Sequence, residues 1–160
     1  MELWNQPGFP HKGWVSEAVI DLREDEGLQF DEYEDCEACG HEHIRFVHVL
    51  RHSSYSQNIR VGCICAEKLT DDYVGPRVEE RKLRNLAARR QRFFRQKWKI
   101  SRKGHFWTKL DGVHVGVIPL PNGKFRVWIG VQFGKLVYDT MKAAQTRIFD
   151  VVQKQKQRPD

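Results

Sequence analysis

Two pairs of closely spaced cysteines constrain the fold of this chain more than any other feature of its sequence. Cys36 and Cys39 are separated by two residues, Cys63 and Cys65 by one, and these are the only four cysteines of the chain. In a reducing compartment, clustered cysteines are metal ligands more often than disulfides. Two pairs joined by a hairpin supply the four thiolates of a closed, tetrahedral zinc site. We therefore predict that all four cysteines bind one structural Zn²⁺.

The fourth ligand of this predicted site is open to an alternative. Cys63 is the weakest candidate, because Cys-x-Cys is a rarer zinc spacing than Cys-x2-Cys. A histidine could replace it, and the candidates are His41, His43, His48 and His52. The first cysteine pair precedes a candidate strand, and Cys65 begins a short helical run. This order of knuckle, hairpin and helix is that of a treble clef.

The hydrophobic pattern predicts an α+β fold in three segments. Residues 1–75 would form the zinc-bound, treble-clef-like unit, with strands near 14–22, 44–50 and 59–62. Residues 76–103 would form a long basic helix, since Pro76 suits a helix start and neither Pro nor Gly follows before Gly104. Residues 104–160 would form an antiparallel three-stranded sheet, with strands near 113–118, 124–131 and 135–138. A final helix capped by Thr140 would cover it.

Alternation along residues 124–131 separates an apolar face from a polar one. Phe125, Val127, Ile129 and Val131 share the face that needs a helix against it. Lys124, Arg126 and Trp128 lie on the other face, to which His114 from the preceding strand would add. On the long helix, most apolar residues fall within one arc and most arginines outside it.

Charge is distributed very unevenly along the chain. Residues 1–76 carry 6 basic and 15 acidic side chains, whereas residues 77–103 carry 12 and 2, a net charge of +10 within 27 residues. Such a segment needs an anionic partner, and polyphosphate is the commonest. An internal alternative is pairing with the nine acidic side chains between Asp21 and Glu37. The predicted phosphate contacts on the helix are Arg81, Lys82, Arg84, Arg89, Arg92, Arg95, Lys99, Arg102 and Lys103, with Arg126 and Trp128 as a second contact surface.

Several short motifs resemble a bacterial family of small hypothetical proteins. They are Cys36-Glu37-x-Cys39-Gly40, Arg45-x-Val47-His48, Val61-Gly62-Cys63-x-Cys65-Ala66, Asp72-Tyr73 and Arg89-Arg90. The resemblance covers roughly residues 13 to 115. It implies a cytoplasmic bacterial zinc protein, and it implies no reaction or ligand.

The order of these residues is also similar to that of zinc-containing HNH endonucleases. A cysteine pair, His48 or His52, Asn58 and a second cysteine pair follow one another. Such nucleases need a further histidine, in the helix after the second pair, to hold catalytic Mg²⁺. This chain has Ala66-Glu67-Lys68 there, so we expect no nuclease activity and keep a degenerate nuclease as a second alternative.

Residues 106–152 resemble, in pattern only, three-stranded-sheet DNA-binding domains such as those of plant ethylene-response factors and the arm-binding domains of phage integrases. With the basic helix in front, the order of elements is also that of double-stranded RNA-binding domains. Both resemblances imply that cations and an aromatic ring face phosphates or bases.

The preferred interpretation is a non-enzymatic, zinc-dependent nucleic-acid-binding protein, with DNA and RNA both open. The alternative partner is a protein, with the acidic N-terminal part acting as an adaptor surface. No phosphate loop, nucleophile elbow or dinucleotide fingerprint occurs, so no small-molecule substrate is indicated. No apolar run approaches the roughly 18 residues of a membrane span, and the N-terminus lacks the pattern of a signal peptide, which predicts a cytoplasmic protein without membrane contact.

Overall fold

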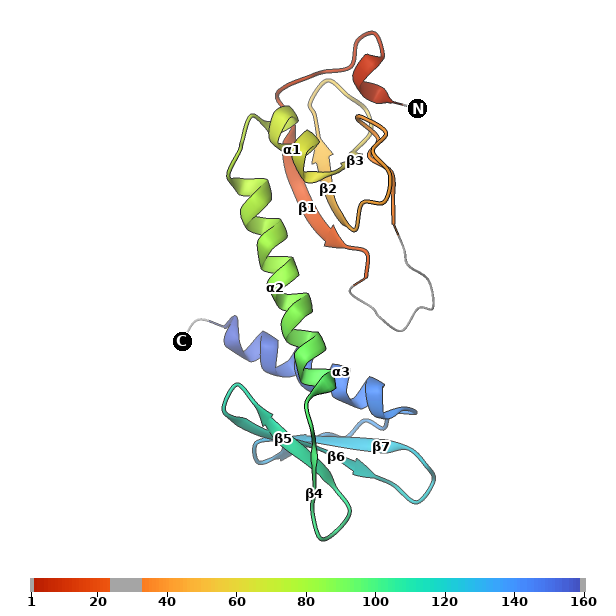
Figure 1. The fold of residues 1–160 in the computed structure, drawn as a ribbon, viewed down its shortest axis with the longest axis vertical. Coiled ribbons are helices and arrows are strands. Elements are labelled where there is room, and N and C mark those ends of the chain that lie inside the picture. Colours follow the sequence, from red (N-terminus) through yellow and green to blue (C-terminus); the bar gives the residue numbers. More distant parts are fainter. Residues whose placement is uncertain (1, 24–32, 159–160) are drawn as a thin grey trace. The chain divides into compact units, whose positions relative to one another are not determined.

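The computed structural model describes residues 2–23 and 33–158. The chain divides into two compact units, Met1–Ala87 and Ala88–Asp160, with the boundary inside α2 (Gly75–Arg95). The described residues form three α-helices and two antiparallel sheets, which confirms the predicted α+β class (Figure 1). The long helix is therefore shared by the two units instead of forming a segment of its own.

No helix in the described part of the chain combines the length and the apolar character that crossing a membrane would require.

The first unit is built on a three-stranded sheet. After a 3₁₀ helix at Leu3–Asn5, the strands are β1 (Val15–Asp21), β2 (Phe46–Arg51) and β3 (Ile59–Val61), in the order β1-β2-β3. All three lie within a few residues of their predicted positions. The helix α1 (Cys63–Thr70) follows β3 almost immediately and contacts β2.

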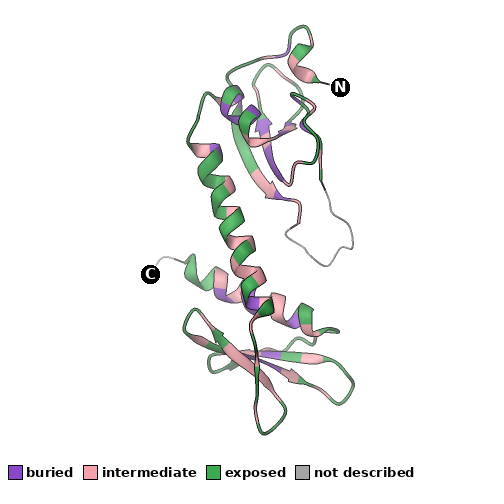
Figure 2. Ribbon diagram, viewed as in Figure 1, coloured by how far each residue is buried: buried purple, intermediate pink, exposed green. Residues whose placement is uncertain are grey.

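The core of this unit combines aliphatic, aromatic and cysteine side chains. Trp14, Leu50 and Leu69 are nearly inaccessible to solvent, and Cys36 and Cys65 belong to the same buried cluster (Figure 2). The strand β2 is buried along almost its whole length. The cysteines are thus part of the packing of the unit as well as potential ligands.

The helix α2 starts where predicted but ends earlier. Asp72 accepts hydrogen bonds from the backbone N–H groups of Val74 (2.9 Å) and Gly75 (2.8 Å), which cap the helix start. The helix stops at Arg95, whereas we predicted helix through residue 103. The reason is a hairpin: Lys99–Ile100 forms β4 and pairs with Phe106–Trp107, so sheet hydrogen bonds replace the last helical turns.

The second unit contains a five-stranded meander, not the three-stranded sheet expected. Its strands run in sequence order, namely β4 followed by β5 (Phe106–Leu110), β6 (Val113–Pro119), β7 (Phe125–Ile129) and β8 (Gln132–Phe133). The strand predicted at 135–138 is wrong, since only Tyr138 in that range forms a bridge, to Phe125. Gly130 adopts a positive φ of 60°. That conformation lets the chain reverse directly after Ile129, earlier than the hydrophobic pattern indicated. Val131, which we predicted on the buried face, is therefore exposed.

The last helix, α3 (Met141–Lys156), confirms the prediction in detail. Thr140 caps it, and its side-chain oxygen accepts a hydrogen bond from the backbone N–H of Ala143 at 3.0 Å. The helix contacts β6 and β7. The buried residues of this unit come from both layers and from α2; they are Phe93, Val115, Val117, Val127, Ala144, Ile148, Phe149 and Val152.

Candidate functional site

Three of the four cysteines lie close together in the first unit and could hold a metal ion. The sulfur atoms of Cys36, Cys39 and Cys65 all lie within 4.8 Å of one another. Cys36 and Cys39 sit on a tight turn, in which the backbone N–H of Gly40 donates to the carbonyl of Cys36 at 2.7 Å. Gly40 has a φ of 70°, a conformation that favours glycine. Cys65 comes from the first turn of α1.

The fourth cysteine is not part of this group. Cys63 and Cys65 are two residues apart on α1, and two residues turn an α-helix by about 200°. Their side chains therefore point to different sides of the helix. We predicted that the helical run begins at Cys65, which left Cys63 outside it, whereas both cysteines belong to α1.

The thiols of this group influence one another strongly. The hydrogen bond from Cys65 lowers the pKa of Cys36 to about 5, although burial acts in the opposite direction. The same hydrogen bond, together with burial, raises the pKa of Cys65 well above its usual range. Both shifts have the same main cause, a hydrogen bond between the two buried cysteines.

Cys63 belongs to a second group, in which its partners are His48 from β2 and Glu80 from α2. The ligand atoms of these three residues also lie within 4.8 Å of one another, and His48 Nε2 is 3.2 Å from Glu80 Oε2. Burial, with the charge of Glu80, raises the pKa of the Cys63 thiol to about 12.

Two carboxylates of the same region are held ionised by arginines. Burial acts to raise the pKa of Glu80, but hydrogen bonds from Arg84 and His48 bring it below its usual value. A hydrogen bond from Arg77 lowers the pKa of the buried Glu67. Our sequence analysis assigned no role to Glu80 in a metal site, and no local spacing could have suggested one, because the helix brings it back to β2 from 32 residues away.

A cavity of about 620 Å³ lies beside both groups. Its walls include Cys36, Cys39, Cys63, Cys65 and Glu80. Of the histidines considered as alternatives to Cys63, His41 and His43 also line it. Neither has a ligand atom within 4.8 Å of all three sulfur atoms, so the cavity wall is what these histidines share with the three-cysteine group.

The remaining histidines have other partners. His48 is only 1% exposed and is bonded to Glu80. Nε2 of His52 is hydrogen-bonded to the carbonyl oxygen of Lys12, and Nδ1 accepts a hydrogen bond from the backbone N–H of Ser54. Asn58 is exposed. His48 and His52, which are similar in order to residues of an HNH site, thus have different hydrogen-bond partners.

The cations that we predicted to contact phosphates fall into two sets, those with an ion-pair partner and those without one. Lys82 pairs with Glu79, Arg84 with Glu80, and Arg89 with Asp111 at 2.7 Å. Among the described residues, no ion pair involves Arg81, Arg92, Arg95, Lys99, Arg102, Lys103 or Arg126. The second set is exposed and is the better match to the predicted phosphate contacts.

The acidic residues on either side of residues 24–32 do not pair with the helix. Asp21 binds Arg45 at 2.8 Å and Glu34 binds Arg60 at 2.7 Å, so both carboxylates pair with arginines on or next to the sheet of the first unit. The acidic positions within 24–32 lie outside the described residues, so the internal-pairing alternative is tested only for the flanking ones.

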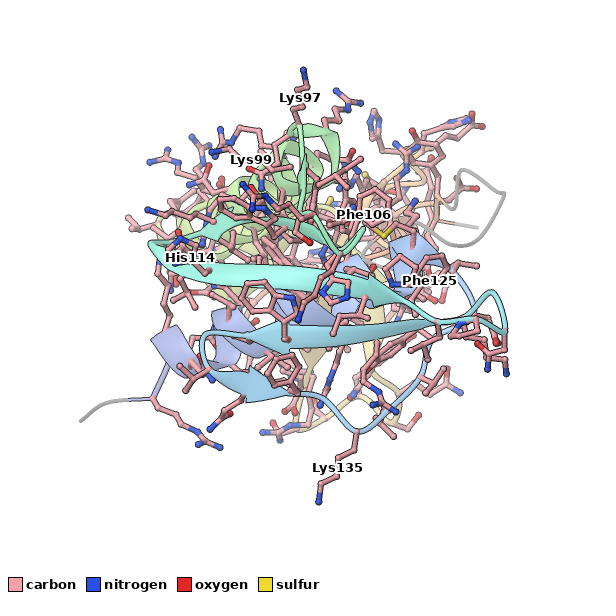
Figure 3. All side chains as sticks on the ribbon, turned by 90° about the horizontal axis from the view of Figure 1, so that it is seen from below. Lys97, Lys99, Phe106, His114, Phe125 and Lys135 are labelled. Carbon is pink, nitrogen blue, oxygen red and sulfur yellow. The ribbon has the colours of Figure 1, made fainter. Side chains whose placement is uncertain are left out.

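A row of aromatic residues crosses the sheet of the second unit. The strand registers align Lys99 with Trp107, Trp107 with Gly116, Gly116 with Trp128, and Trp128 with Phe133. Neighbouring residues in one row share a face. This face is opposite to the one that carries Val115, Val117 and Val127, the buried residues that lie towards α3. Figure 3 looks at the sheet from below, with its strands in front of α3 and Lys99 and His114 labelled.

Two details show how the rings of this row are held. A Cβ atom at Gly116 would overlap the indole of Trp128, so the Trp128 ring lies directly over the backbone of β6. The amine of Lys99 is 4.8 Å from the ring centroid of Trp107, and the His114 ring is 5.8 Å from it. Phe133, at the end of the row, is 69% exposed.

Comparisons of the chain with protein-family models, with curated proteins and with solved structures found no match.

Proposed function

We propose that the chain is a non-enzymatic nucleic-acid-binding protein whose second unit binds single strands on the open face of its sheet. The observation that carries this proposal is the row Trp107, Trp128 and Phe133, flanked by Lys99 and extended by Arg126 two residues before Trp128. Aromatic rings on a basic surface stack on bases of any sequence while the cations contact phosphates.

The flat placement of Trp128 supports a stacking role. Because the ring lies over Gly116, one of its faces packs on the sheet and the other is available for a base. Bases of a duplex are already stacked on each other, whereas unpaired bases have free faces. The row therefore favours single-stranded DNA or RNA over a duplex, and nothing in it distinguishes the sugars.

The unpaired cations supply the phosphate contacts in this proposal. Arg92, Arg95, Lys99, Arg102, Lys103 and Arg126 belong to the second unit and have no ion-pair partner among the described residues. Arg89 is less suitable than we predicted, since Asp111 and Gln153 already bind its guanidinium.

For the first unit, the proposal includes one bound metal ion. Thiolate donors favour Zn²⁺ among the divalent ions, so we assign zinc to Cys36, Cys39 and Cys65, with His41, His43 or water in the fourth position. The turn that carries Cys36 and Cys39, the hairpin β2–β3 and the helix α1 occur in the order of a treble clef. The role of this zinc is structural.

Fluorescence anisotropy with labelled single-stranded DNA, single-stranded RNA and the matching duplex tests the proposal. Stacking on a protein ring is worth about 1–3 kcal/mol per base, so Trp128→Ala should weaken single-strand binding by roughly 5- to 150-fold. The dependence of affinity on salt should stay the same. Val131→Ala, an equally simple truncation of a side chain that is 93% exposed, is the control.

Two charge-removing variants distinguish a direct phosphate contact from the general effect of net charge. Arg126→Gln should lower the slope of log K against log salt by about 0.7 for a single strand. Lys154→Gln removes the same charge from α3, which covers the other face, and should leave the slope unchanged. If the parent protein binds none of the three nucleic acids, the proposal fails and the adaptor alternative takes its place.

A further inference from the structure

The group around Cys63 combines three different donor types from three elements of the first unit. His48 lies on β2, Cys63 is the first residue of α1, and Glu80 lies in the second turn of α2. Their ligand atoms lie within 4.8 Å of one another. A tetrahedral ion with bonds of about 2.0–2.3 Å places its ligand atoms roughly 3.3–3.8 Å apart. A contraction of at most about 1.5 Å would bring this group to that geometry.

The donor atoms are hydrogen-bonded to one another and to neighbouring residues. Arg84 binds Oε1 of Glu80 at 2.6 Å, which leaves Oε2 directed to His48 at 3.2 Å. The Cys63 thiol lies 3.9 Å from Oε1 of Glu67, the oxygen that also accepts a hydrogen bond from Nε of Arg77. The three ligand atoms that lie close together are therefore a nitrogen of His48, the sulfur of Cys63 and a carboxylate oxygen of Glu80.

Burial makes this arrangement unlike an ordinary surface cluster. The side chains of His48 and Glu67 are 1% and 4% exposed, and that of Glu80 is 14% exposed. Buried polar groups of this kind are normally fully paired or bound to an ion. A divalent cation at the centre would take the place of the His48–Glu80 hydrogen bond and bind the imidazole, the sulfur and the Glu80 carboxylate together.

We propose that His48, Cys63 and Glu80 form a second transition-metal site, distinct from the group of Cys36, Cys39 and Cys65. The mixture of nitrogen, sulfur and oxygen donors selects an ion of the zinc class over Mg²⁺ or Ca²⁺, which take oxygen donors. Three protein ligands leave the fourth position of a tetrahedral ion open. Cys63 and Glu80 line the cavity of about 620 Å³, so that position faces a space large enough for water or a small ligand.

The proposal also explains the Cys-x-Cys spacing. Successive odd positions at the start of α1 point about 200° apart, so Cys63 and Cys65 each serve one of two neighbouring sites. The cavity walls contain members of both groups. The second site does not depend on nucleic-acid binding, which we assign to the other unit.

Metal titration of the full chain tests the proposal directly. Reduced protein freed of metal is titrated with Co²⁺, whose thiolate charge-transfer absorbance reports sulfur ligands, and bound Zn²⁺ is counted separately by elemental analysis. We expect two ions per chain, the tighter with several thiolates and the weaker with one. Binding of a single ion at saturating Co²⁺ and Zn²⁺ would overturn the proposal.

Two variants assign the second ion to its ligands. Glu80→Gln keeps the size and the hydrogen-bonding capacity of the side chain but removes the charged donor. It should weaken the second ion at least about 10-fold, the lower limit seen when even supporting partners of a metal are lost. Cys63→Ser should remove the single-thiolate absorbance of the second ion. In both variants the first ion should bind as in the parent.

Controls keep these outcomes interpretable. Glu79→Gln changes the neighbouring, exposed carboxylate, which pairs with Lys82, and should leave both ions unaffected. Far-UV circular dichroism of each variant checks folding, and Glu80→Gln alone decides the question if Cys63→Ser does not fold. The proposal fails if Glu80→Gln binds two ions with parental affinity. It also fails if Cys63→Ser weakens the first ion, because Cys63 would then complete the three-cysteine group.

Discussion

The two units of this protein are stabilised in different ways. The second unit buries an aliphatic and aromatic core between a five-stranded sheet and α3, and the buried residues of its described part, 88–158, contain no charged or metal-binding side chain. In the described part of the first unit, the buried set also contains Cys36, Cys65, Asp21, His48 and Glu67. A core of this second kind depends on partners, because each buried polar group is stable only when it is bonded. The same chain thus contains one unit held by apolar packing and one that needs its polar groups satisfied.

The largest expected effect is the loss of the first unit when metal is removed. Structural zinc contributes on the order of 10 kcal/mol to its local fold, so a chelator should unfold the segment around residues 33–75 while the sheet of the second unit stays folded. Amide hydrogen exchange of the full chain, read segment by segment, measures this. Returning Zn²⁺ to the chelated protein is the control and should restore protection. Equal loss of protection in β1–β3 and in β5–β7 would contradict the difference between the units.

The sequence predicted most where the local signal was strong. Thr140 before an amphipathic run identified α3, and the alternation of Phe125, Val127 and Ile129 gave the buried face of β7. The apolar Trp14–Leu22 segment likewise gave β1. In each case the residues that decide the structure are neighbours in the sequence, so their pattern contains the information.

Predictions failed where distant segments decide. Residues 96–103 have a helical composition, but pairing of Lys99–Ile100 with Phe106–Trp107 overrides it. The spacing of the cysteines identified the three residues that could hold a metal ion together. The rotation of α1 instead directs Cys63 to His48 and to Glu80, which lies 17 residues further on. The aromatic row could not be read from the sequence either, because it depends on the register of five strands.

An intermediate effect is expected from a core substitution in the second unit. Ile148 on α3 is fully buried, and truncating a buried Ile to Ala costs about 2–5 kcal/mol. Ile148→Ala should therefore lower the stability of the second unit by that amount, measured by chemical unfolding of the zinc-loaded protein. Its metal content should be unchanged.

Lys154→Ala, an exposed change on the same helix, is the control and should stay within about 0.5 kcal/mol of the parent. A loss of zinc from Ile148→Ala would show that the two units are not stabilised independently.

The smallest expected effect concerns pH and the start of α2. Hydrogen bonds from the backbone N–H groups of Gly75 and Val74 hold the pKa of Asp72 below its usual range. Because the pKa is lower in the folded than in the unfolded protein, Asp72 stabilises the fold above its ordinary value near 4. This contribution is lost as the pH falls through the lower folded pKa. Asp72→Ala should therefore be less stable than the parent at pH 7, and the difference should shrink towards pH 3.

Asp72→Asn is the matched control, since its side-chain oxygen still accepts the capping hydrogen bonds but does not titrate. It should remain close to the parent at pH 7 and show a weaker pH dependence. If Asp72→Ala and the parent differ by the same amount at both pH values, the carboxylate charge contributes nothing. The helix start would then resemble the second unit, whose buried residues, as far as the structure describes them, are all apolar.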